Sequence, residues 1–178
     1  VIGGGPGGLN AARIAAMRGH QVFLYEKMPA LGGQLILGSA SFYKKEMLSL
    51  IHFLIKQIEK YNVHCSFNTR ATIETVIENR PDVVITATGS IPFLPPVKGI
   101  DLPIVITVLE ILNGNKSSFH DVIVIGGGPT GCEVALELSE KGSNVTIVEQ
   151  LPQIGAKIEA MTKKMIITRL KTVSYTHL

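Results

Sequence analysis

Cysteine is scarce in this sequence, with two residues, Cys65 and Cys132, among 178. Two cysteines are too few for a disulfide scaffold and fit a reducing compartment, so we expect a cytoplasmic protein. They also cannot ligate a four-iron cluster, which needs four ligands. Cys132 follows Gly131 at the expected start of a helix, where the pKa of a thiol can be lowered. A lone cysteine on a packed helix is more often a small buried apolar residue, and we interpret Cys132 in that way.

Long apolar runs, clustered basic residues and spaced histidines are also missing. No apolar run approaches the roughly 18 residues that span a bilayer, which argues against a membrane protein. The net charge is +3, and the Lys and Arg residues are scattered, so no nucleic-acid footprint is present. The five histidines show neither metal-ligand spacing nor a triad partner, and we predict no metal site and no catalytic side chain. A composition of 46% hydrophobic and 17% charged residues excludes a disordered chain.

Glycine is abundant, with 18 residues, and much of it belongs to an internal repeat. Residues 1–33 and 124–156 align without a gap at an offset of 123, with 13 identities in 33 positions. The identical residues of the first copy are Val1, Ile2, Gly3, Gly4, Gly5, Pro6, Gly8, Ala12, Gly19, Val22, Glu26, Pro29 and Gly32. The offset is far longer than a solenoid period, so we predict two homologous domains.

Each copy has the pattern of a strand, a helix and a second strand. In the second copy we expect strands over 122–125 and 144–148 and a helix over 129–141, with Gly142 as its stop. In the first copy the second strand is expected over 21–25, and the first strand is nearly absent, because the sequence opens on Val1 and Ile2 without an initiator Met or a signal peptide. We therefore expect the N-terminus to lie inside a domain. The predicted fold class is α/β, with two Rossmann-like dinucleotide-binding domains built from βαβ parallel sheets, both incomplete.

The segment between the copies adds further elements. Residues 43–61 form an amphipathic pattern typical of a helix that packs on a sheet, and a membrane-surface helix is the less favoured alternative. Strands are expected over 63–67 and 83–87, and a short helix near 108–112. A polar loop over 113–118 is a natural boundary. We predict a first domain over 1–115 and the first part of a second over 120–171.

The repeated glycines carry the chemistry. Gly3, Gly5 and Gly8 have the GxGxxG spacing, and the second copy repeats it. In this fingerprint the first glycine permits a tight turn, the second lets the backbone approach a pyrophosphate, and the third lets the helix pack on the strand. The helix N-terminus, with a proline near its first turn, then offers N–H groups to the pyrophosphate. The candidate residues of the second copy are Gly126, Gly128, Pro129 and Gly131, and Pro6 is the matching proline of the first.

An acid ends the second strand of each copy. Glu26 and Glu149 each stand 18 residues after the third glycine, where a carboxylate can accept hydrogen bonds from an adenosine ribose. The alternatives are incidental glycine turns with surface glutamates, or a methyltransferase-like loop, and both are disfavoured because the full spacing occurs twice. Glu149 would repel the extra phosphate of NADP, and no Arg lies nearby in sequence, so we favour NADH over NADPH.

Two other small-residue segments fit the same site. Gly32, Gly33 and Gln34 follow Glu26 closely and would let the backbone approach a cofactor, although a simple loop turn explains them equally well. Residues 86–89, including Ala87, Thr88 and Gly89, close an apolar strand with small side chains, as a strand end against a ligand does.

Together these motifs resemble a known class of proteins. The segments VIGGGPGGLNAA, YEK, GGQL, TATG and VIGGGPTGCEVA are similar to those of flavoproteins with two dinucleotide-binding domains, and the following helix LSLIHFLIKQIEKYNV resembles the NADH:flavin oxidoreductases related to 2,4-dienoyl-CoA reductase and trimethylamine dehydrogenase. The resemblance, which extends to about Lys171, implies FAD at the first motif and NADH at the second. It assigns to FAD Gly3, Gly5, Pro6, Gly8, Glu26, Lys27, Gly33, Gln34, Ala71, Ala87, Thr88 and Gly89. It assigns to NADH Gly126, Gly128, Pro129, Thr130, Gly131 and Glu149.

The resemblance also implies what lies elsewhere. In this family the NADH domain is an insertion in the FAD domain, and a flavin-binding barrel with an iron–sulfur cluster lies upstream, so FMN and a 4Fe–4S cluster are expected only in an upstream region that this sequence lacks. Residues 34–50 contain no CxxxxC pair, and no CxxC occurs, which separates the chain from disulfide reductases and thioredoxin reductases. The last residues, TVSYTHL over 172–178, depart from the family, so we expect a non-native tail and leave it out of the fold prediction.

The function that we expect is electron input. NADH gives a hydride to FAD, which passes electrons to another redox centre or to an enoyl- or enone-type substrate. One alternative is an electron-transfer flavoprotein subunit of the glutamate synthase type, and another is a non-catalytic dinucleotide sensor. The partners are cofactors and a small substrate, and the sequence does not indicate an oligomeric state. Because both domains are incomplete, we expect residues 1–171 to be poorly stable alone.

Overall fold

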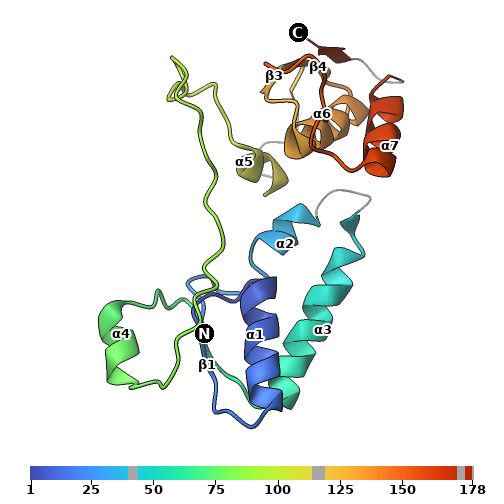
Figure 1. Cartoon of the computed structure of the whole chain (residues 1–178). Helices are drawn as coiled ribbons and strands as arrows, with labels where there is room; N and C mark the ends of the chain where they lie inside the picture. The colour runs from blue at the N-terminus through green and yellow to red at the C-terminus, as the bar shows by residue number, and fades with distance from the viewer. Residues whose placement is uncertain (40–43, 114–118, 172–174, 178) are drawn as a thin grey trace. The chain divides into compact units, whose positions relative to one another are not determined.

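The computed structural model describes residues 1–39, 44–113, 119–171 and 175–177. It contains two compact units, Val1–Ile100 and Asp101–Leu178, and each combines helices with parallel strands (Figure 1). The predicted α/β class with parallel βαβ sheets is therefore confirmed. The division between the units falls before the predicted polar boundary over 113–118, of which only residue 113 is described. The assignment of residues 1–115 and 120–171 to two domains stays a prediction.

The sheet of the first unit is parallel and short. Strand β1 (Phe23–Tyr25) pairs with β2 (His64–Ser66), and Ile2 forms single bridges to Tyr25 and Thr86. The predicted strands over 21–25 and 63–67 are thus present but shorter. The predicted strand over 83–87 is wrong as a full strand, because its recorded pairing is one bridge. At that bridge the N–H of Ile2 donates to Ile85 O at 2.9 Å and the N–H of Ala87 donates to Ile2 O at 2.8 Å.

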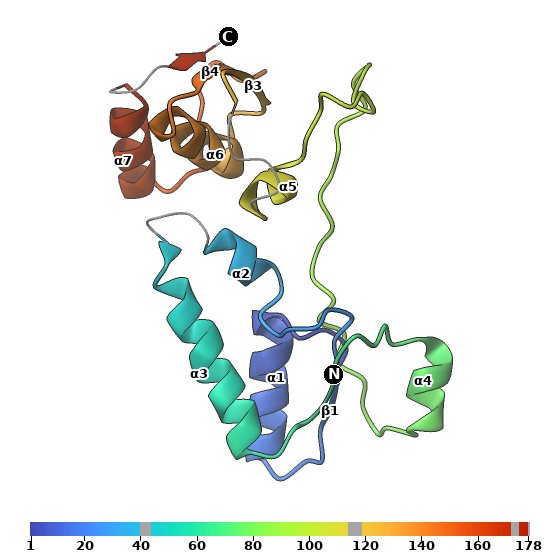
Figure 2. The same cartoon turned by 180° about the vertical axis from the view of Figure 1, so that it is seen from behind.

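Four helices accompany this sheet: α1 (Pro6–Met17), α2 (Gln34–Gly38), α3 (Met47–Lys60) and α4 (Ile73–Glu78). Helices α1 and α3 lie side by side in both views (Figures 1 and 2). The amphipathic helix predicted over 43–61 is confirmed over α3, and residue 43 lies outside the described residues. The core of the unit consists of Leu9, Ala12, Val22, Leu24, Leu31, Leu54 and Ile58.

The second unit has three parallel strands in the order β3-β4-β5. Its elements are α5 (Val108–Leu112), β3 (Asp121–Ile125), α6 (Pro129–Glu140), β4 (Asn144–Val148), α7 (Ala160–Leu170) and β5 (Tyr175–His177). The elements predicted over 108–112, 122–125, 129–141 and 144–148 are confirmed to within one residue at each end. Residues 172–178 were left out of the fold prediction; within them the backbone of Tyr175–His177 forms β5, which pairs with β4. The non-native origin of this tail stays a prediction.

The second unit buries apolar residues where α6 packs on β4 and α7 packs on α6. Val145 and Ile147 of β4 are buried, as are Ile166 and Leu170 of α7. Cys132 of α6 has no exposed surface, and burial raises the pKa of its thiol. The interpretation of Cys132 as a small buried residue is therefore confirmed.

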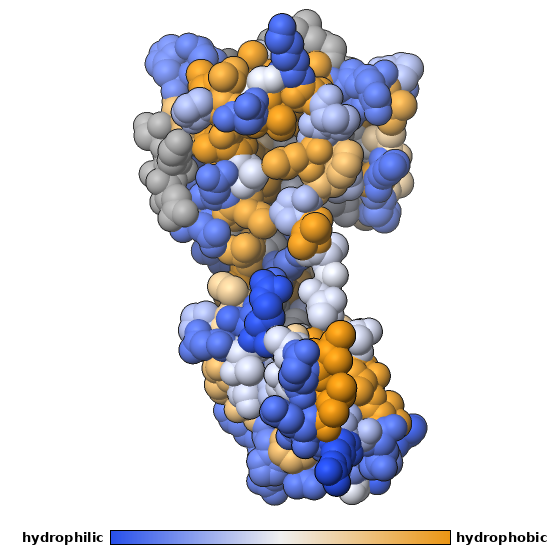
Figure 3. All heavy atoms as spheres, turned by 90° about the vertical axis from the view of Figure 1, so that its left-hand side faces the viewer, coloured by the Kyte–Doolittle hydropathy of each residue, from blue (hydrophilic) through white to orange (hydrophobic). Residues whose placement is uncertain are grey.

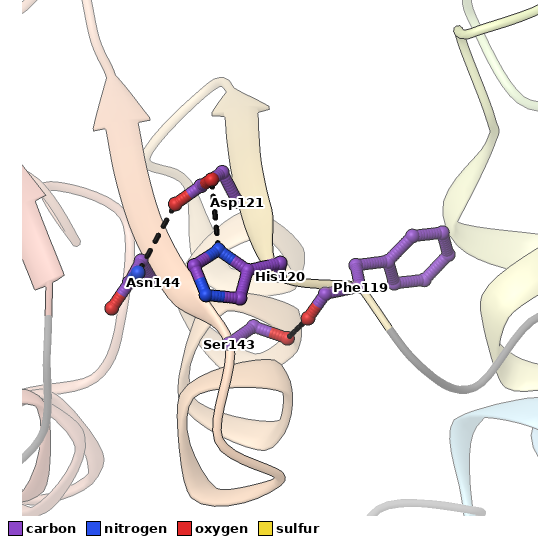
Figure 4. A network of polar contacts seen from close by, with 5 residues as sticks. All are labelled: Phe119, His120, Asp121, Ser143 and Asn144. Atoms are coloured by element: carbon purple, nitrogen blue, oxygen red, sulfur yellow. Dashed lines mark hydrogen bonds and ion pairs between the residues drawn. The ribbon is translucent and has the colours of Figure 1, made fainter.

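A polar network fixes the register of β3 against β4 at the strand ends far from the glycine turn (Figure 4). Asn144 Nδ2 donates to Asp121 Oδ1 at 3.1 Å, and His120 Nδ1 lies 2.9 Å from Asp121 Oδ2. Ser143 Oγ donates to Phe119 O at 2.7 Å. This network raises the pKa of His120 and lowers the pKa of Asp121, in each case mainly through their mutual hydrogen bond.

Several apolar side chains are exposed, and Figure 3 shows one face with patches of hydrophobic residues. Examples are Ile91 at 86% exposure, Phe93 at 82% and Ile123 at 69%. The first unit also has a groove of about 820 Å³ lined by residues that include Val1, Ile14, Phe23 and Val83. None of the candidate cofactor residues lines this groove. Among the described residues, no helix is long and apolar enough to cross a membrane.

Candidate functional site

The first glycine of each motif makes the turn from strand to helix. Gly3 has φ of 104° and Gly126 has φ of 101°, a region that favours glycine. The N–H of Gly3 donates to Tyr25 O at 2.8 Å, and the N–H of Gly126 donates to Val148 O at 2.8 Å. The two turns therefore leave their sheets in the same way, as the repeat predicts.

The third glycine permits close packing of helix on turn. A Cβ added to Gly8 would lie 1.8 Å from Gly3 O, and one added to Gly131 would lie 1.8 Å from Gly126 O. No side chain fits at these distances. The predicted packing role of the third glycine is confirmed in both copies.

The second glycine caps each helix and leaves space beside it. Gly5 precedes α1 and Gly128 precedes α6, and Pro6 and Pro129 occupy the first turn of the helices. Among the described residues, a Cβ added to Gly128 would meet nothing within 4 Å, and one added to Gly5 would meet Gly33 Cα at 4.0 Å. Each helix N-terminus thus presents its first N–H groups and positive dipole end beside room for an anion. This geometry fits a pyrophosphate.

The acid of each copy binds the backbone of its own turn. Glu26 Oε2 accepts from the N–H of Gly4 at 2.6 Å, and Glu26 Oε1 accepts from the N–H of Met28 at 2.8 Å. Glu149 repeats this arrangement, with Gly127 at 2.8 Å and Leu151 at 2.9 Å. Each of the two carboxylates therefore joins its glycine turn to the chain that follows the strand. Ribose binding by either acid stays a prediction.

The middle glycines, Gly4 and Gly127, are structural residues that the fingerprint spacing does not identify. Their C=O groups accept from the N–H of Gly32 at 2.8 Å and of Gly155 at 2.6 Å. A Cβ on Gly4 would lie 2.5 Å from Leu31 Cδ2, and one on Gly127 would lie 2.6 Å from Ile154 Cγ2. The signal was available in the sequence, because all four glycines are identical across the repeat.

The first turn has a cover formed by two other candidate segments. A Cβ on Gly33 would lie 2.9 Å from Gly5 Cα, so the backbones of these glycines are in contact. The Gln34 side chain donates to Ser90 O, which ties the start of α2 to the segment after Gly89. On the other side, a Cβ on Gly3 would meet the backbone of Ala87 and Thr88 at 2.4 to 3.3 Å. The structure therefore brings residues 3–5, 33–34 and 87–90 together.

Less structural evidence bears on three predicted residues, Lys27, Ala71 and Thr130. Lys27 is exposed immediately after Glu26. The N–H of Thr69 donates to Glu26 O at 2.8 Å, which brings the chain near the acid two residues before Ala71. Thr130 is exposed in the first turn of α6. The cofactor contacts assigned to these residues stay predictions.

Among the described residues, no group of three or more His, Cys, Asp or Glu side chains is placed to hold a metal ion.

Each unit is a βαβ element whose glycine turn opens a helix beside a carboxylate, and this defines a protein with two dinucleotide-binding folds. A family comparison agrees with this class over nearly the whole chain. The chain belongs to the pyridine nucleotide-disulphide oxidoreductase family, whose model matches residues 1–173.

Individual relatives have been characterised as oxidoreductases. An NADH oxidase of Thermoanaerobacter brockii is 43% identical over 167 residues, which cover 92% of this chain and 26% of that protein. A cinnamate reductase of Clostridium sporogenes is 36% identical over 174 residues, which cover 96% of this chain and 26% of that protein. The chain thus spans about a quarter of the length of these relatives.

A solved structure supports the same relationship. The 2-naphthoyl-CoA reductase, in complex with 2-naphthoyl-CoA, matches with a TM-score of 0.92 and 31% identity, over 100% of this chain and 27% of that one. The histamine dehydrogenase of Rhizobium sp. 4-9 matches with a TM-score of 0.83 at 23% identity, over 99% of this chain and 29% of that one, and shows the fold alone. The predicted resemblance to NADH:flavin oxidoreductases is confirmed by these matches.

Proposed function

We propose that this chain is the part of a flavin-dependent oxidoreductase that binds FAD at its first glycine turn and NADH at its second. The observation that carries the proposal is the duplicated turn, in which Gly5 or Gly128 directly precedes a helix N-terminus and a carboxylate binds the turn. The bound pair would supply hydride transfer from NADH to FAD, followed by electron transfer to an acceptor.

The chain's own residues bind and orient. The N–H groups that open α1 and α6 bind the two pyrophosphates, and Gly5 and Gly128 let the backbone approach them. Glu26 and Glu149 stand beside the turns at the ends of the second strands, where a carboxylate can bind ribose hydroxyls. No side chain of this chain needs to move a proton for the hydride step.

The two turns suit different residence times. Gly33 and the contact between Gln34 and Ser90 cover the first turn. At the second turn, a Cβ added to Gly128 would meet no described atom within 4 Å. A covered turn suits a resident cofactor, and an open turn suits a ligand that enters and leaves in each cycle. We assign FAD to the first turn and NADH to the second for this reason.

The choice of NADH over NADPH follows from charge. Glu149 is half-buried and places its carboxylate within hydrogen-bond distance of the Gly127 N–H. A phosphate on the nearby ribose would be repelled by this carboxylate. NADH lacks that phosphate and is the proposed donor.

The remainder of the enzyme is proposed from the relatives. We assign residues 1–115 to an FAD domain and 120–171 to the beginning of an inserted NADH domain, and any FMN or 4Fe–4S cluster to a region upstream. Cinnamate and 2-naphthoyl-CoA, named in two relatives, are conjugated molecules. Such names support an enoyl- or enone-type acceptor for the whole protein. A cytoplasmic location is supported by two unpaired cysteines.

The test uses the longer protein purified under anaerobic conditions. We expect a yellow protein whose flavin absorbance is bleached by NADH and restored by an unsaturated acceptor. A colourless protein that still binds nucleotide would instead support a dinucleotide sensor. An upstream reading frame without a flavin-binding barrel would support an electron-transfer subunit of the glutamate synthase type.

A further inference from the structure

We propose that Glu149, and Glu26 in the first copy, are positioning residues that lock the pyrophosphate turn, in addition to any contact with ribose. This inference rests on the proposed function, because it names how the second turn is held ready for NADH. If this acid is replaced, we therefore expect weaker binding of the whole nucleotide and not of its ribose alone.

Glu149 joins the turn to the chain that follows β4. Its Oε2 accepts from the N–H of Gly127 at 2.8 Å, and its Oε1 accepts from the N–H of Leu151 at 2.9 Å. Hydrogen bonds to an ionised carboxylate are among the stronger ones in proteins. Each oxygen is therefore engaged by a different segment, and the carboxylate bridges them.

Gly127 is held from its carbonyl side as well. Its C=O accepts from the N–H of Gly155 at 2.6 Å and from the thiol of Cys132 at 3.2 Å. A Cβ at Gly127 would overlap the side chain of Ile154, so the turn requires glycine at this position. With both backbone polar groups of Gly127 fixed, the position of Gly128, which faces the pyrophosphate, is fixed too.

The first copy repeats the lock with different surroundings. Gly4 donates to Glu26 and accepts from Gly32, and Glu26 is only 5% exposed. Leu31 replaces Ile154 and Leu9 replaces Cys132 at the aligned positions. Two copies that differ in their neighbouring side chains keep the same carboxylate bonds, which indicates that the bonds belong to the turn.

The variant Glu149→Gln removes part of the hydrogen bonding of the carboxylate and keeps the size of the side chain. In Glu149→Gln one oxygen becomes an NH₂ group, which donates and cannot accept from Gly127 or Leu151. One of the two bonds is lost, and an N–H group then faces another N–H group. The turn loosens although the side chain keeps its volume.

The test measures the affinity of the full-length protein for NADH and for an NADH analogue that lacks the 2′-hydroxyl of the adenosine ribose. In Glu149→Gln we expect both affinities to fall by a similar factor, about tenfold or more. Weaker NADH binding with unchanged binding of the analogue would overturn the lock and leave a ribose contact alone. A wild-type protein that binds neither ligand would instead contradict the proposed function.

A control and a second measurement keep the test decisive. The matched control is Gln150→Ala, next to Glu149 and exposed, which should leave both affinities unchanged. The second measurement is amide hydrogen exchange of the wild-type protein without nucleotide. Its result does not depend on whether the variant folds. We expect the Gly127 amide to be protected, and exchange at the rate of an unstructured peptide would overturn the proposal.

Discussion

Gly33 and Gly5 are in direct backbone contact, since a Cβ added to Gly33 would lie 2.9 Å from Gly5 Cα. Gly33 also has φ of 54°, which a larger residue adopts only with strain. The loop before α2 therefore covers the helix N-terminus to which we assign FAD. The aligned position of the second copy is Ala156, so this cover distinguishes the two copies.

The first prediction concerns that contact. Gly33→Ala should displace the cover from Gly5 and reduce FAD content in the purified full-length protein by about tenfold or more, since overlap and backbone strain of about 1–3 kcal/mol add together. The measurement is the ratio of flavin to protein absorbance. Gly38→Ala is the matched control, because Gly38 ends α2 and an added Cβ there meets no described residue within 4 Å. Equal flavin content in both variants would contradict the role of the cover.

The second prediction compares two neighbouring glycines of α1. Gly8→Ala would place a Cβ 1.8 Å from Gly3 O and should destabilise the first unit by about 3 kcal/mol or more. Gly7→Ala meets no described residue within 4 Å and should stabilise the helix by about 0.5–1 kcal/mol. Thermal unfolding of the full-length protein measures both. A similar melting temperature for the two variants would show that the helix does not pack so closely.

The third prediction concerns nucleotide choice. Glu149→Arg should raise the ratio of kcat/KM for NADPH to that for NADH, because the repulsive carboxylate is replaced by a cation. Since Glu149 also holds Gly127, its loss should lower NADH use at the same time. Glu149→Ala should weaken NADH binding without any gain for NADPH. Identical NADH and NADPH kinetics in the wild type and both variants would remove Glu149 from the site.

The fourth prediction concerns pH. The hydrogen bond with Asp121 raises the pKa of His120, so its contribution to stability is present below the usual pKa of about 6.5 and is lost as the pH rises through the raised value. The pKa of Asp121 is lowered, so its contribution is present above about 3.9 and is lost as the pH falls. The pair therefore stabilises most between these values. An NMR titration should show a lower His120 pKa in Asp121→Asn, and an unchanged pKa would show that the contact is absent in solution.

The fifth prediction concerns the isolated segment. Residues 1–171 expose large apolar side chains such as Ile91, Phe93 and Ile123, which a complete domain normally covers. Expressed alone, this segment should bind a hydrophobic dye and unfold gradually with urea. A single cooperative unfolding transition would show that the two units are stable by themselves.

The βαβ elements were predictable because their signals are local and repeated. The strand Asn144–Val148 was predicted residue for residue, since β-branched residues lie between a glycine stop and an acid. Helices α2 and α4 were missed, whereas α5, which is equally short, was predicted. A capping signal exists for α4, where Thr72 accepts from the N–H of Thr75. The length of the strand over 83–87 depends on its partners, which local sequence does not contain.

The residues of the candidate site were predictable, but the hydrogen bonds that join them were not. The fingerprint identified the turn at Gly3 and the close packing at Gly8, because both roles are steric and local; the role of Gly5 stays a prediction. The fingerprint did not identify the bonds between Glu26 and Gly4, because 22 residues separate them and the acid was interpreted only as a ligand. The identity of Gly4 and Gly32 with Gly127 and Gly155 was the available signal.

The groove beside Val1 has a practical consequence for anyone who handles this region. The backbone nitrogen of Val1 donates to Phe23 O at 2.7 Å, and both residues line the groove. A label on a residue that lines this groove, such as Ile2, would disturb the bridges that Ile2 forms to Tyr25 and Thr86. Labels and fusions are better placed at exposed positions such as Asn10 or Lys56, on the outer faces of α1 and α3.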